Sequence, residues 1–498
     1  MKLSRRQLLA SSLAAPALGA GAALAEAASP APRADSPPDP DVVSGMSARL
    51  AGFASGLRYE ALPEPVVSSV RNSILDALGV GLAASGLEPV CRPFVEHART
   101  LAGQGRAHVL GFGFTAPASY AALANGAMAH ALDYEDVHEA SSTHPNAATV
   151  AAAMALAEEL GQVDGKRLIA AVAAGSEVAI RLALARTDDW TRHGWYIPPI
   201  AGAFGAAAAA ANLLRLDVQQ TLAAFSMTLC QSSCSAEILY SPAADIRAVR
   251  DGFAAQAGLV SAQLARSGVV GFERPIEGQA GFYAMFARGL YRPGAVVDGL
   301  GTRFDNADVA FKAWPSCRGT HLYVQAAIDL HRQGLSDPEE IVCTINPRNA
   351  ELCTPEKQRP VSAIDAKFSI PFCVATALRN GQVTLASFSD TALSDPATLA
   401  LAARVRAVHD AQRARPASAG GGAVVELVMV DGVRHARDVR HLRGSVEDPL
   451  SQQELHAKFV ECGLLAASRP QRDRIELLAS SVASLDGVGD VGTLLTGL

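Results

Sequence analysis

The sequence predicts a mainly α-helical protein, with a large helical domain and a smaller α+β domain. From residue 43 to about residue 265 the chain is a series of apolar or amphipathic helical patterns separated by Gly and Pro, with almost no β-branched alternation. After Arg266 strand patterns appear among the helices, and after Pro449 the pattern is helical to the end. We therefore expect the C-terminal helices to complete the first domain.

Residues 1–28 have the features of an export signal. Arg5 and Arg6 follow Ser4, an apolar stretch comes next, and Ala23-Leu24-Ala25 provides a cleavage site of small residues. This pattern resembles a twin-arginine signal peptide, with an ordinary secretory signal as the alternative. We expect the signal to be removed and the mature protein to be periplasmic. Residues 29–42 are rich in Pro and polar, which is typical of a linker.

Residues 43–270 form the predicted helical domain. Ala203–Leu214 (AFGAAAAAANLL) is built from small residues and is too short to span a bilayer, which indicates a tightly packed interior helix. Glu177 and Arg181 are four residues apart on another predicted helix, so we interpret them as a structural ion pair.

Residues 271–445 form the predicted α+β domain, and residues 446–498 are the returning helices. Glu339–Ile345 alternates like a strand, and Asp431-Gly432 joins two strand patterns as a hairpin turn. The basic run Arg404–Arg415 is interpreted as a solvated helix and loop. Ser451 and Glu454 predict a capping box at the start of a C-terminal helix.

Composition excludes several classes of protein. The 498 residues carry a formal net charge of −6, and this acidic balance does not favour a nucleic-acid-binding protein. No apolar run beyond the N-terminus suggests a membrane span, so we expect no membrane association after signal removal. The eight cysteines include no CxxC pair and no zinc or iron–sulfur spacing, and no disulfide can be assigned from their positions.

Acidic residues and histidines gather between Asn125 and Thr149, in an otherwise alanine-rich region. Helical patterns on both sides place these residues on a helix end and a connecting loop, where rigid elements position reactive groups. Asp133 and His144 have the properties of a proton-transfer pair. A histidine titrates near neutral pH, and a carboxylate can fix its tautomer and stabilise its charged form.

Later segments supply positive charges, namely Arg247 and Arg250 in DIRAVRDG and Lys312 and Arg318 in FKAWPSCRGTH. Cations that converge on an acid/base pair suit a substrate with carboxylates, because they clamp the carboxylates and stabilise a developing enolate-like charge.

A metal site made by Asp133, Asp136, His138 and His144 is the alternative interpretation of the same loop. The spacing of these residues does not place two imidazoles on one helical face, as HExxH does. We therefore favour an acid/base site without a metal.

Several ordered motifs resemble the MmgE/PrpD family, which includes 2-methylcitrate dehydratase, cis-aconitate decarboxylase and iminodisuccinate epimerase. The resemblance covers residues 43–498. Its motifs are NSILDALGVGLAASG (72–86), HALDYEDVH with THP (130–145), GSEVAIRL (175–182), GAFGAAAAAANLL (202–214), IEGQAGF (276–282), FKAWPSCRGTH (311–321), AKFSIPF (366–372) and PLSQQELHAKF (449–459).

The resemblance implies a helical domain made of N- and C-terminal parts, an α+β lid, an active site between them, homodimers, and chemistry without an iron–sulfur cluster. By position, Asp133, His144 and Lys312 match the family's active-site residues, and His321 matches the histidine that closes the lysine motif.

The chain also departs from the family. Tyr196 stands where many relatives have a histidine, and Arg247 stands where many have a lysine. Val137 and Phe372 stand where some decarboxylases carry Thr and Tyr. The departures alter the set of acid/base groups.

We therefore predict a cofactor-independent enzyme that acts on a small di- or tricarboxylate by removing a proton next to a carboxylate. The first candidate is a hydro-lyase similar to 2-methylcitrate dehydratase. The second is an epimerase, isomerase or decarboxylase of the family. A periplasmic carboxylate-binding protein without turnover is the alternative outside enzymes. Asp133, His144, Tyr196 and Lys312 are the predicted catalytic residues, and Arg247, Arg250, Arg318 and His321 are predicted to bind substrate.

Overall fold

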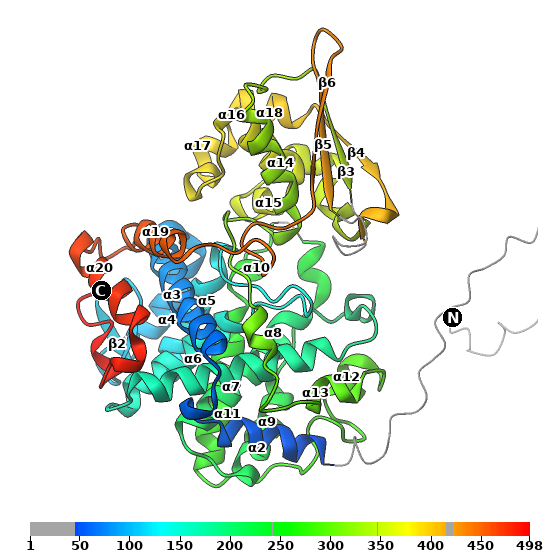
Figure 1. Ribbon diagram of the computed structural model, residues 1–498. Helices are drawn as coiled ribbons and strands as arrows, with labels where there is room; N and C mark the ends of the chain where they lie inside the picture. Colours follow the sequence, from blue (N-terminus) through cyan, green and yellow to red (C-terminus); the bar gives the residue numbers. More distant parts are fainter. Residues whose placement is uncertain (1–44, 242, 346, 415–421) are drawn as a thin grey trace, which may run out of the picture. The chain divides into compact units, whose positions relative to one another are not determined.

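A computed structural model describes residues 45–241, 243–345, 347–414 and 422–498 (Figure 1). The predicted signal peptide and linker lie outside the described residues. The described chain is largely helical, as the sequence predicts.

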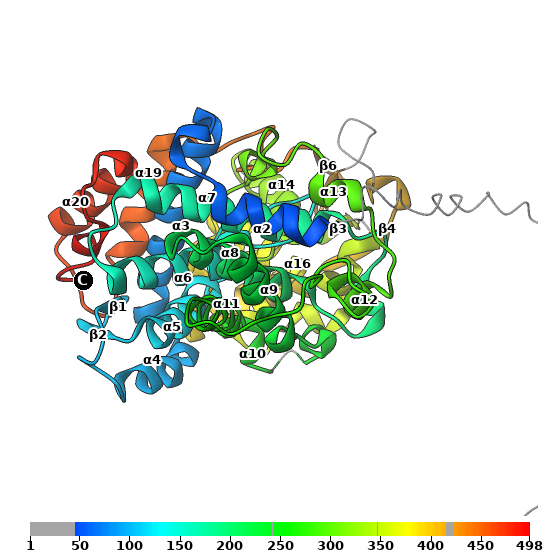
Figure 2. The ribbon, with the colours of Figure 1, turned by 90° about the horizontal axis from the view of Figure 1, so that it is seen from below.

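Most helices belong to one body that contains both ends of the described chain. Its elements before residue 300 are α2 (Met46–Gly56), α3 (Glu64–Leu87), α4 (Arg92–Arg99), β1 (Ala107–Val109), β2 (Phe114–Ala116), α5 (Ala118–Ala131), α6 (Pro145–Leu160), α7 (Gly165–Leu184), α8 (Ile197–Leu213), α9 (Val218–Gln231), α10 (Ile246–Val249), α11 (Asp251–Arg266), α12 (Phe282–Ala287) and α13 (Pro293–Val297). The C-terminal helices α19 (Gln452–Gly463) and α20 (Arg472–Ala483) pack against α3, as both views show (Figures 1 and 2).

The core of this body is built from small residues. Every residue of α8 is buried, which confirms the predicted interior helix, and α8 packs against α6, α7 and α11. Alanine allows helix axes to approach closely, so the apolar area is buried without large side chains. The predicted pair Glu177–Arg181 is also confirmed: both side chains are fully buried and lie 2.5 Å apart.

A close contact between α5 and α11, made at two glycines, positions Arg250 at the site. A Cβ on Gly126 of α5 would lie 2.9 Å from the Asp251 carbonyl oxygen, and a Cβ on Gly252 of α11 would lie 2.4 Å from the Leu123 carbonyl oxygen. Only glycine permits this approach. It brings Arg250, just before α11, against the end of α5.

The remaining elements surround a four-stranded sheet in the order β4-β3-β5-β6. They are α14 (His321–His331), β3 (Glu340–Ile345), α15 (Ala363–Lys367), α16 (Ile370–Asn380), α17 (Asp390–Leu393), α18 (Pro396–Ala402), β4 (Val405–His409), β5 (Ala423–Val428) and β6 (Arg434–Val439). β3 and the β5–β6 hairpin confirm the predicted strands, and the predicted capping box of Ser451 and Glu454 starts α19.

The interpretation of Arg404–Arg415 as a solvated helix and loop was wrong. Residues 405–409 form β4, which pairs in parallel with β3 at the edge of the sheet. Val405 is buried while Arg406 and Val408 are exposed. An edge strand with one solvated face tolerates this basic composition, so charge alone misled the sequence interpretation.

The sheet and its helices have their own hydrophobic core, but a separate lid domain is not confirmed. All described residues fall in one compact unit. The segment from Ile276 to Phe304, predicted to belong to the α+β domain, packs in the core of the helical body. Ion pairs also join the two parts, such as the buried Lys367 with the half-buried Glu88 of the loop after α3 at 2.8 Å.

Among the described helices, α3 alone has the length and hydropathy of a membrane span. Its most apolar window is 83% buried inside the protein, which is typical of a core helix.

Candidate active site

The loop between α5 and α6 carries the central residues of the site. His130 lies in the last turn of α5, and His144 is the N-cap residue of α6, whose first residue is Pro145. Proline suits the first helical position because its missing N–H has no partner there. Asp133 has a φ of +50°, in the left-handed region that few non-glycine residues adopt, and this conformation turns the chain sharply after α5.

Asp133 and Lys312 form a buried ion pair. Lys312 Nζ donates to the carbonyl oxygen and to Oδ1 of Asp133, both at 2.8 Å, and neither side chain is more than 2% exposed. Burial opposes the charged form of both groups. Burial by itself would raise the pKa of Asp133, but Lys312 together with His130 and His144 holds that pKa below its usual range. Asp133 with Glu135 in turn raises the pKa of Lys312.

The imidazole of His144 is neutral and can act as a base. Its Nδ1 donates to the Asp136 carbonyl oxygen at 2.8 Å, so that nitrogen carries the proton and Nε2 keeps its lone pair. Burial lowers the pKa of His144 to about 4, against the opposing effect of Glu135. The His144 side chain is 13% exposed, whereas those of His130 and Glu135 are at most 1% exposed.

Glu135, rather than Asp133, contacts the imidazole of His144. Glu135 Oε1 lies 3.1 Å from His144 Nδ1 and also accepts a hydrogen bond from His130 Nδ1. Sequence reasoning chose Asp133 as the partner of His144, whereas the structure engages Asp133 with Lys312. Glu135 and His130 were not identified as site residues. The one signal for them was their place in the HALDYEDVH motif.

Arg250 is buried behind the histidines. Its guanidinium donates to His130 Nε2 and lies 3.7 Å from Asp251. Its predicted contact with substrate therefore competes with protein partners, although the Tyr196 ring also lies 5.0 Å from its Cζ.

Arg247 and Tyr196 remain available to a ligand. Arg247 lies over the ring of Phe368 at 3.6 Å, its Nε is buried without a hydrogen-bond partner, and no carboxylate pairs with it among the described residues. Tyr196 is the N-cap residue of α8, and in the described part of the chain its hydroxyl makes no hydrogen bond. Burial raises the pKa of Tyr196, so the phenol is a neutral donor at neutral pH.

Two predicted substrate-binding residues, Arg318 and His321, have partners within the protein. Arg318 donates to Glu139 at 3.0 Å from Nε and to the Arg443 carbonyl oxygen at 2.8 Å. His321 is fully buried, with Nε2 3.1 Å from the Ser316 carbonyl oxygen and its ring against Trp314. These protein acceptors already engage the N–H groups of Arg318 and His321 that a substrate carboxylate would bind.

The alternative metal site has different residues from those predicted. In the described chain His130, Asp133, Glu135 and His144 bring ligand atoms within 4.8 Å of one another. Of the predicted set, Asp136 binds Asn146 and His138 binds Ser141, so neither joins this group. Lys312 binds Asp133 Oδ1 and Arg250 binds His130 Nε2, so two of these four residues already have a positively charged partner.

We expect activity to survive exhaustive chelation, because Lys312 already pairs with Asp133, and Glu135 is engaged by the imidazoles of His130 and His144. Turnover before and after dialysis against a chelator measures this. Loss of turnover that one divalent ion restores would contradict the acid/base interpretation.

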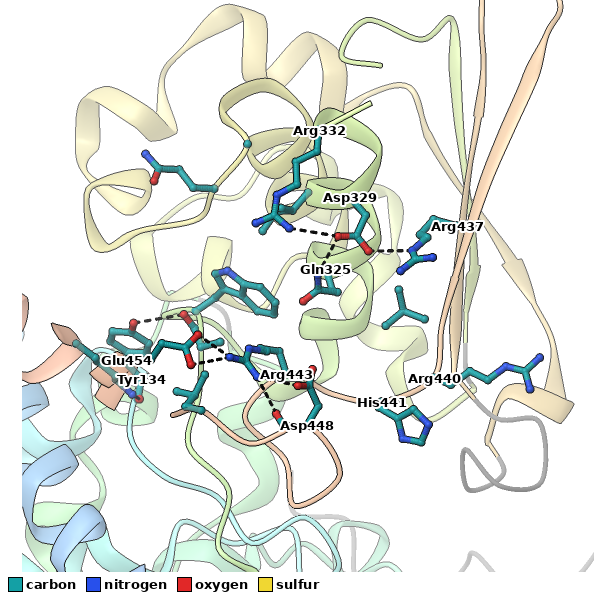
Figure 3. A pocket seen from close by; sticks show the side chains of 18 of the residues that line it. Tyr134, Gln325, Asp329, Arg332, Arg437, Arg440, His441, Arg443, Asp448 and Glu454 are labelled. Carbon is teal, nitrogen blue, oxygen red and sulfur yellow. Dashed lines mark hydrogen bonds and ion pairs between the residues drawn. The ribbon is translucent and has the colours of Figure 1, made fainter. Parts of the chain in front are cut away.

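A cavity of about 860 Å³ lies between α14, β6 and α19, and neither His130 nor His144 is among its lining residues (Figure 3). Its four arginines are already paired: Asp329 binds Arg332 and Arg437, Asp438 binds Arg440, and Asp448 and Glu454 bind Arg443. A second, more apolar cavity of about 530 Å³ has Arg250 in its wall. Paired arginines make the larger cavity a poor carboxylate site compared with the surroundings of Arg247.

Comparison with known proteins identifies the family. Residues 48–292 match the MmgE/PrpD N-terminal domain and residues 314–483 match the MmgE/PrpD C-terminal domain. The chain belongs to the MmgE/PrpD family. The N-terminal match contains Asp133, His144, Tyr196 and Arg247, while Lys312 lies between the two matched ranges.

Relatives of this MmgE/PrpD protein are named as cis-aconitate decarboxylases. The cis-aconitate decarboxylase-like protein oryM of Aspergillus oryzae is 26% identical, over 93% of this chain and 98% of that protein. Cis-aconitate decarboxylase of Mus musculus is 25% identical, over 91% of this chain and 93% of its own. Cis-aconitate decarboxylase of Aspergillus terreus is 26% identical, over 92% of this chain and 96% of that protein. The chain is thus an enzyme of the MmgE/PrpD lyase family, as predicted, whereas the homodimer remains a prediction.

Proposed function

We propose that this enzyme removes a proton from the carbon next to a carboxylate of a small di- or tricarboxylate and then expels water, as a hydro-lyase without a cofactor. One observation carries the proposal: the neutral, partly exposed imidazole of His144 with its proton on Nδ1 and its lone pair on Nε2. A neutral imidazole can accept a proton at once, which suits a reaction that begins with C–H cleavage.

In the proposed reaction His144 Nε2 takes the proton, and the electrons of the C–H bond form a carbon–carbon double bond. The bond to the leaving hydroxyl breaks, and this group departs as water with the proton of the Tyr196 phenol. The proton on His144 later returns to the phenolate through solvent. Arg247 binds the carboxylate next to the reacting carbon, and its charge stabilises the enolate-like transition state.

Replacing Arg247 by Met is expected to lower kcat/KM by about 10- to 100-fold, through a higher KM and a lower kcat, because a hydrogen bond to a charged group contributes roughly 1.5–3 kcal/mol. Initial rates over a range of substrate concentrations measure this. Arg437→Met is the matched control, since Arg437 is paired with Asp329 at 2.8 Å in the larger cavity. Equal KM values in Arg247→Met and the wild type would remove Arg247 from the binding site.

Decarboxylation is the second candidate, favoured by the names of the relatives. Two features weigh against it. Val137 and Phe372 lack the hydroxyls that some decarboxylases carry there, and Phe372 packs in the second core with its ring 6.2 Å from that of Phe388. In addition, a neutral His144 holds no proton on Nε2 to give to the carbanion that loss of CO₂ creates.

A panel of hydroxy-, unsaturated and amino-di- and tricarboxylates, followed by proton NMR in D₂O, tests the proposal. Dehydration gives a new vinyl signal, and epimerisation gives deuterium at the α-carbon without loss of water. Release of CO₂ from cis-aconitate without dehydration of any hydroxy acid would establish the second candidate. Binding of a carboxylate without any conversion would establish the carboxylate-binding protein.

We also propose export to the periplasm by the twin-arginine route. The support is the Ser4-Arg5-Arg6 start with its apolar stretch. Arg5→Lys with Arg6→Lys is expected to abolish accumulation of the processed protein in the periplasm, measured by cell fractionation and immunoblotting. Unchanged accumulation would indicate an ordinary secretory signal.

A further inference from the structure

We propose that Glu135 is a positioning residue, whose carboxylate stabilises the protonated imidazole of His144 during turnover and is itself held by His130 and Arg250. This inference rests on the proposed role of His144 as the base. It adds a second charged residue behind that base, one that does not touch the substrate.

The contacts form a chain that ends at His144. Arg250 donates to His130 Nε2, which fixes the His130 proton on Nδ1, and His130 Nδ1 then donates to Glu135 Oε1. The same oxygen lies 3.1 Å from His144 Nδ1. His130 has both nitrogens engaged and is fully buried, so it holds Glu135 and cannot itself reach a substrate.

Glu135 is needed because the rest of the surroundings of His144 oppose an imidazolium. The ring is largely buried, His144 is the residue at the N-terminus of the 16-residue helix α6, and the Lys312 ammonium lies nearby. The nearby carboxylates are those of Asp133 and Glu135, and Asp133 is neutralised by Lys312. Among the described residues, Glu135 is therefore the carboxylate that can balance a proton gained at Nε2.

Two acceptors lie near His144 Nδ1, and each has a different role. The Asp136 carbonyl oxygen accepts the hydrogen bond at 2.8 Å and so fixes the tautomer, while Glu135 supplies charge. Replacing Glu135 by Gln therefore leaves the resting tautomer in place and removes the stabilisation of the charged state.

The experiment compares wild type and Glu135→Gln by turnover and by NMR. The substitution is expected to lower kcat by about 10- to 100-fold, less than the roughly 10²- to 10⁴-fold expected from loss of the base itself, with KM changed by less than about threefold. In protein with labelled histidines, the titration of His144 between about pH 3 and 7 is expected to move to lower pH, since the carboxylate that favours the charged form is gone.

A double-mutant cycle separates this role from a structural one. Glu135→Gln is expected to have no further effect on the residual kcat of His144→Gln, because the carboxylate acts only through the imidazole. Independent, multiplicative losses would overturn the proposal, as would an unchanged His144 titration.

Glu158→Gln is the matched control. Glu158 is another buried glutamate bound to a histidine, with Oε1 2.7 Å from His108 Nδ1, but it lies outside the site. Glu158→Gln is expected to lower the melting temperature about as much as Glu135→Gln does, while kcat and the His144 titration stay at wild-type values. If Glu135→Gln does not fold, Glu135→Asp keeps the charge at a greater distance, and it is expected to show a smaller shift in the same direction. A titration in Glu135→Asp equal to wild type overturns the proposal.

The two proposals fail in different ways. A wild-type protein that converts no acid of the panel contradicts the proposed function, while the NMR titration still decides whether Glu135 acts on His144. Normal turnover in Glu135→Gln contradicts the role of Glu135 alone.

Discussion

His144→Gln is expected to lower kcat by roughly 10²- to 10⁴-fold, the usual loss when a general base is removed. Stability is expected to change little, because the His144 side chain is partly exposed and makes one hydrogen bond through Nδ1, which the glutamine amide can replace. Steady-state kinetics and thermal unfolding measure the two effects. In wild type, kcat/KM is expected to rise with pH through about 4, the pKa that burial gives His144, as the neutral base form becomes populated.

His138→Gln is the matched control for this prediction. His138 lies in the same loop and is buried, but its Nδ1 is 2.9 Å from Ser141 Oγ and it does not join the other histidines. Its replacement is expected to leave kcat near wild type. Near-normal turnover in His144→Gln would show that another group takes the proton, and a large loss in His138→Gln would favour the metal site predicted as an alternative.

Asp133→Asn is expected to destabilise the protein by about 3–5 kcal/mol, the usual cost of leaving one charge of a buried pair without its partner. Lys312 is fully buried, and its ammonium would keep only neutral oxygen acceptors. Turnover is also expected to fall sharply. Urea unfolding followed by circular dichroism measures the stability.

The pH dependence of this effect follows from both partners. The pKa of Asp133 is held below its unfolded value, so its contribution to stability is present above about pH 4 and is lost as pH falls through the folded pKa. The pKa of Lys312 is raised, so its contribution is present below about pH 10.4 and is lost as pH rises through the folded pKa. The stability difference between wild type and Asp133→Asn should therefore be large near neutral pH and fall below about pH 4. It should also fall at alkaline pH, where the unpartnered Lys312 of the variant loses its proton.

Asp133→Asn combined with Lys312→Met is the informative double variant. Removing both charges removes the unpaired ammonium, and we expect it to recover much of the stability lost in Asp133→Asn. A double variant less stable than Asp133→Asn would show that Lys312 contributes mainly through packing or through the Asp133 carbonyl oxygen.

Local patterns in the sequence determined much of the fold and the location of the site. The glycine of Asp431-Gly432 specified the β5–β6 hairpin, and Ser451 with Glu454 specified the start of α19, because these signals act over a few residues. The charge of Arg404–Arg415, by contrast, did not reveal β4, because a strand at a sheet edge is defined by its pairing with β3.

The sequence by itself placed Asp133 and His144 on the loop between two helices and supplied Lys312 from a later segment. Only the tertiary structure decided which of these groups meet. The left-handed turn at Asp133 directs its carboxylate to Lys312, and the close crossing of α5 and α11 at Gly126 and Gly252 brings Arg250 to His130. Glu135 is thereby left facing His144. Charge pairing in a buried site depends on distances of a few ångströms between distant segments, and no local spacing encodes them.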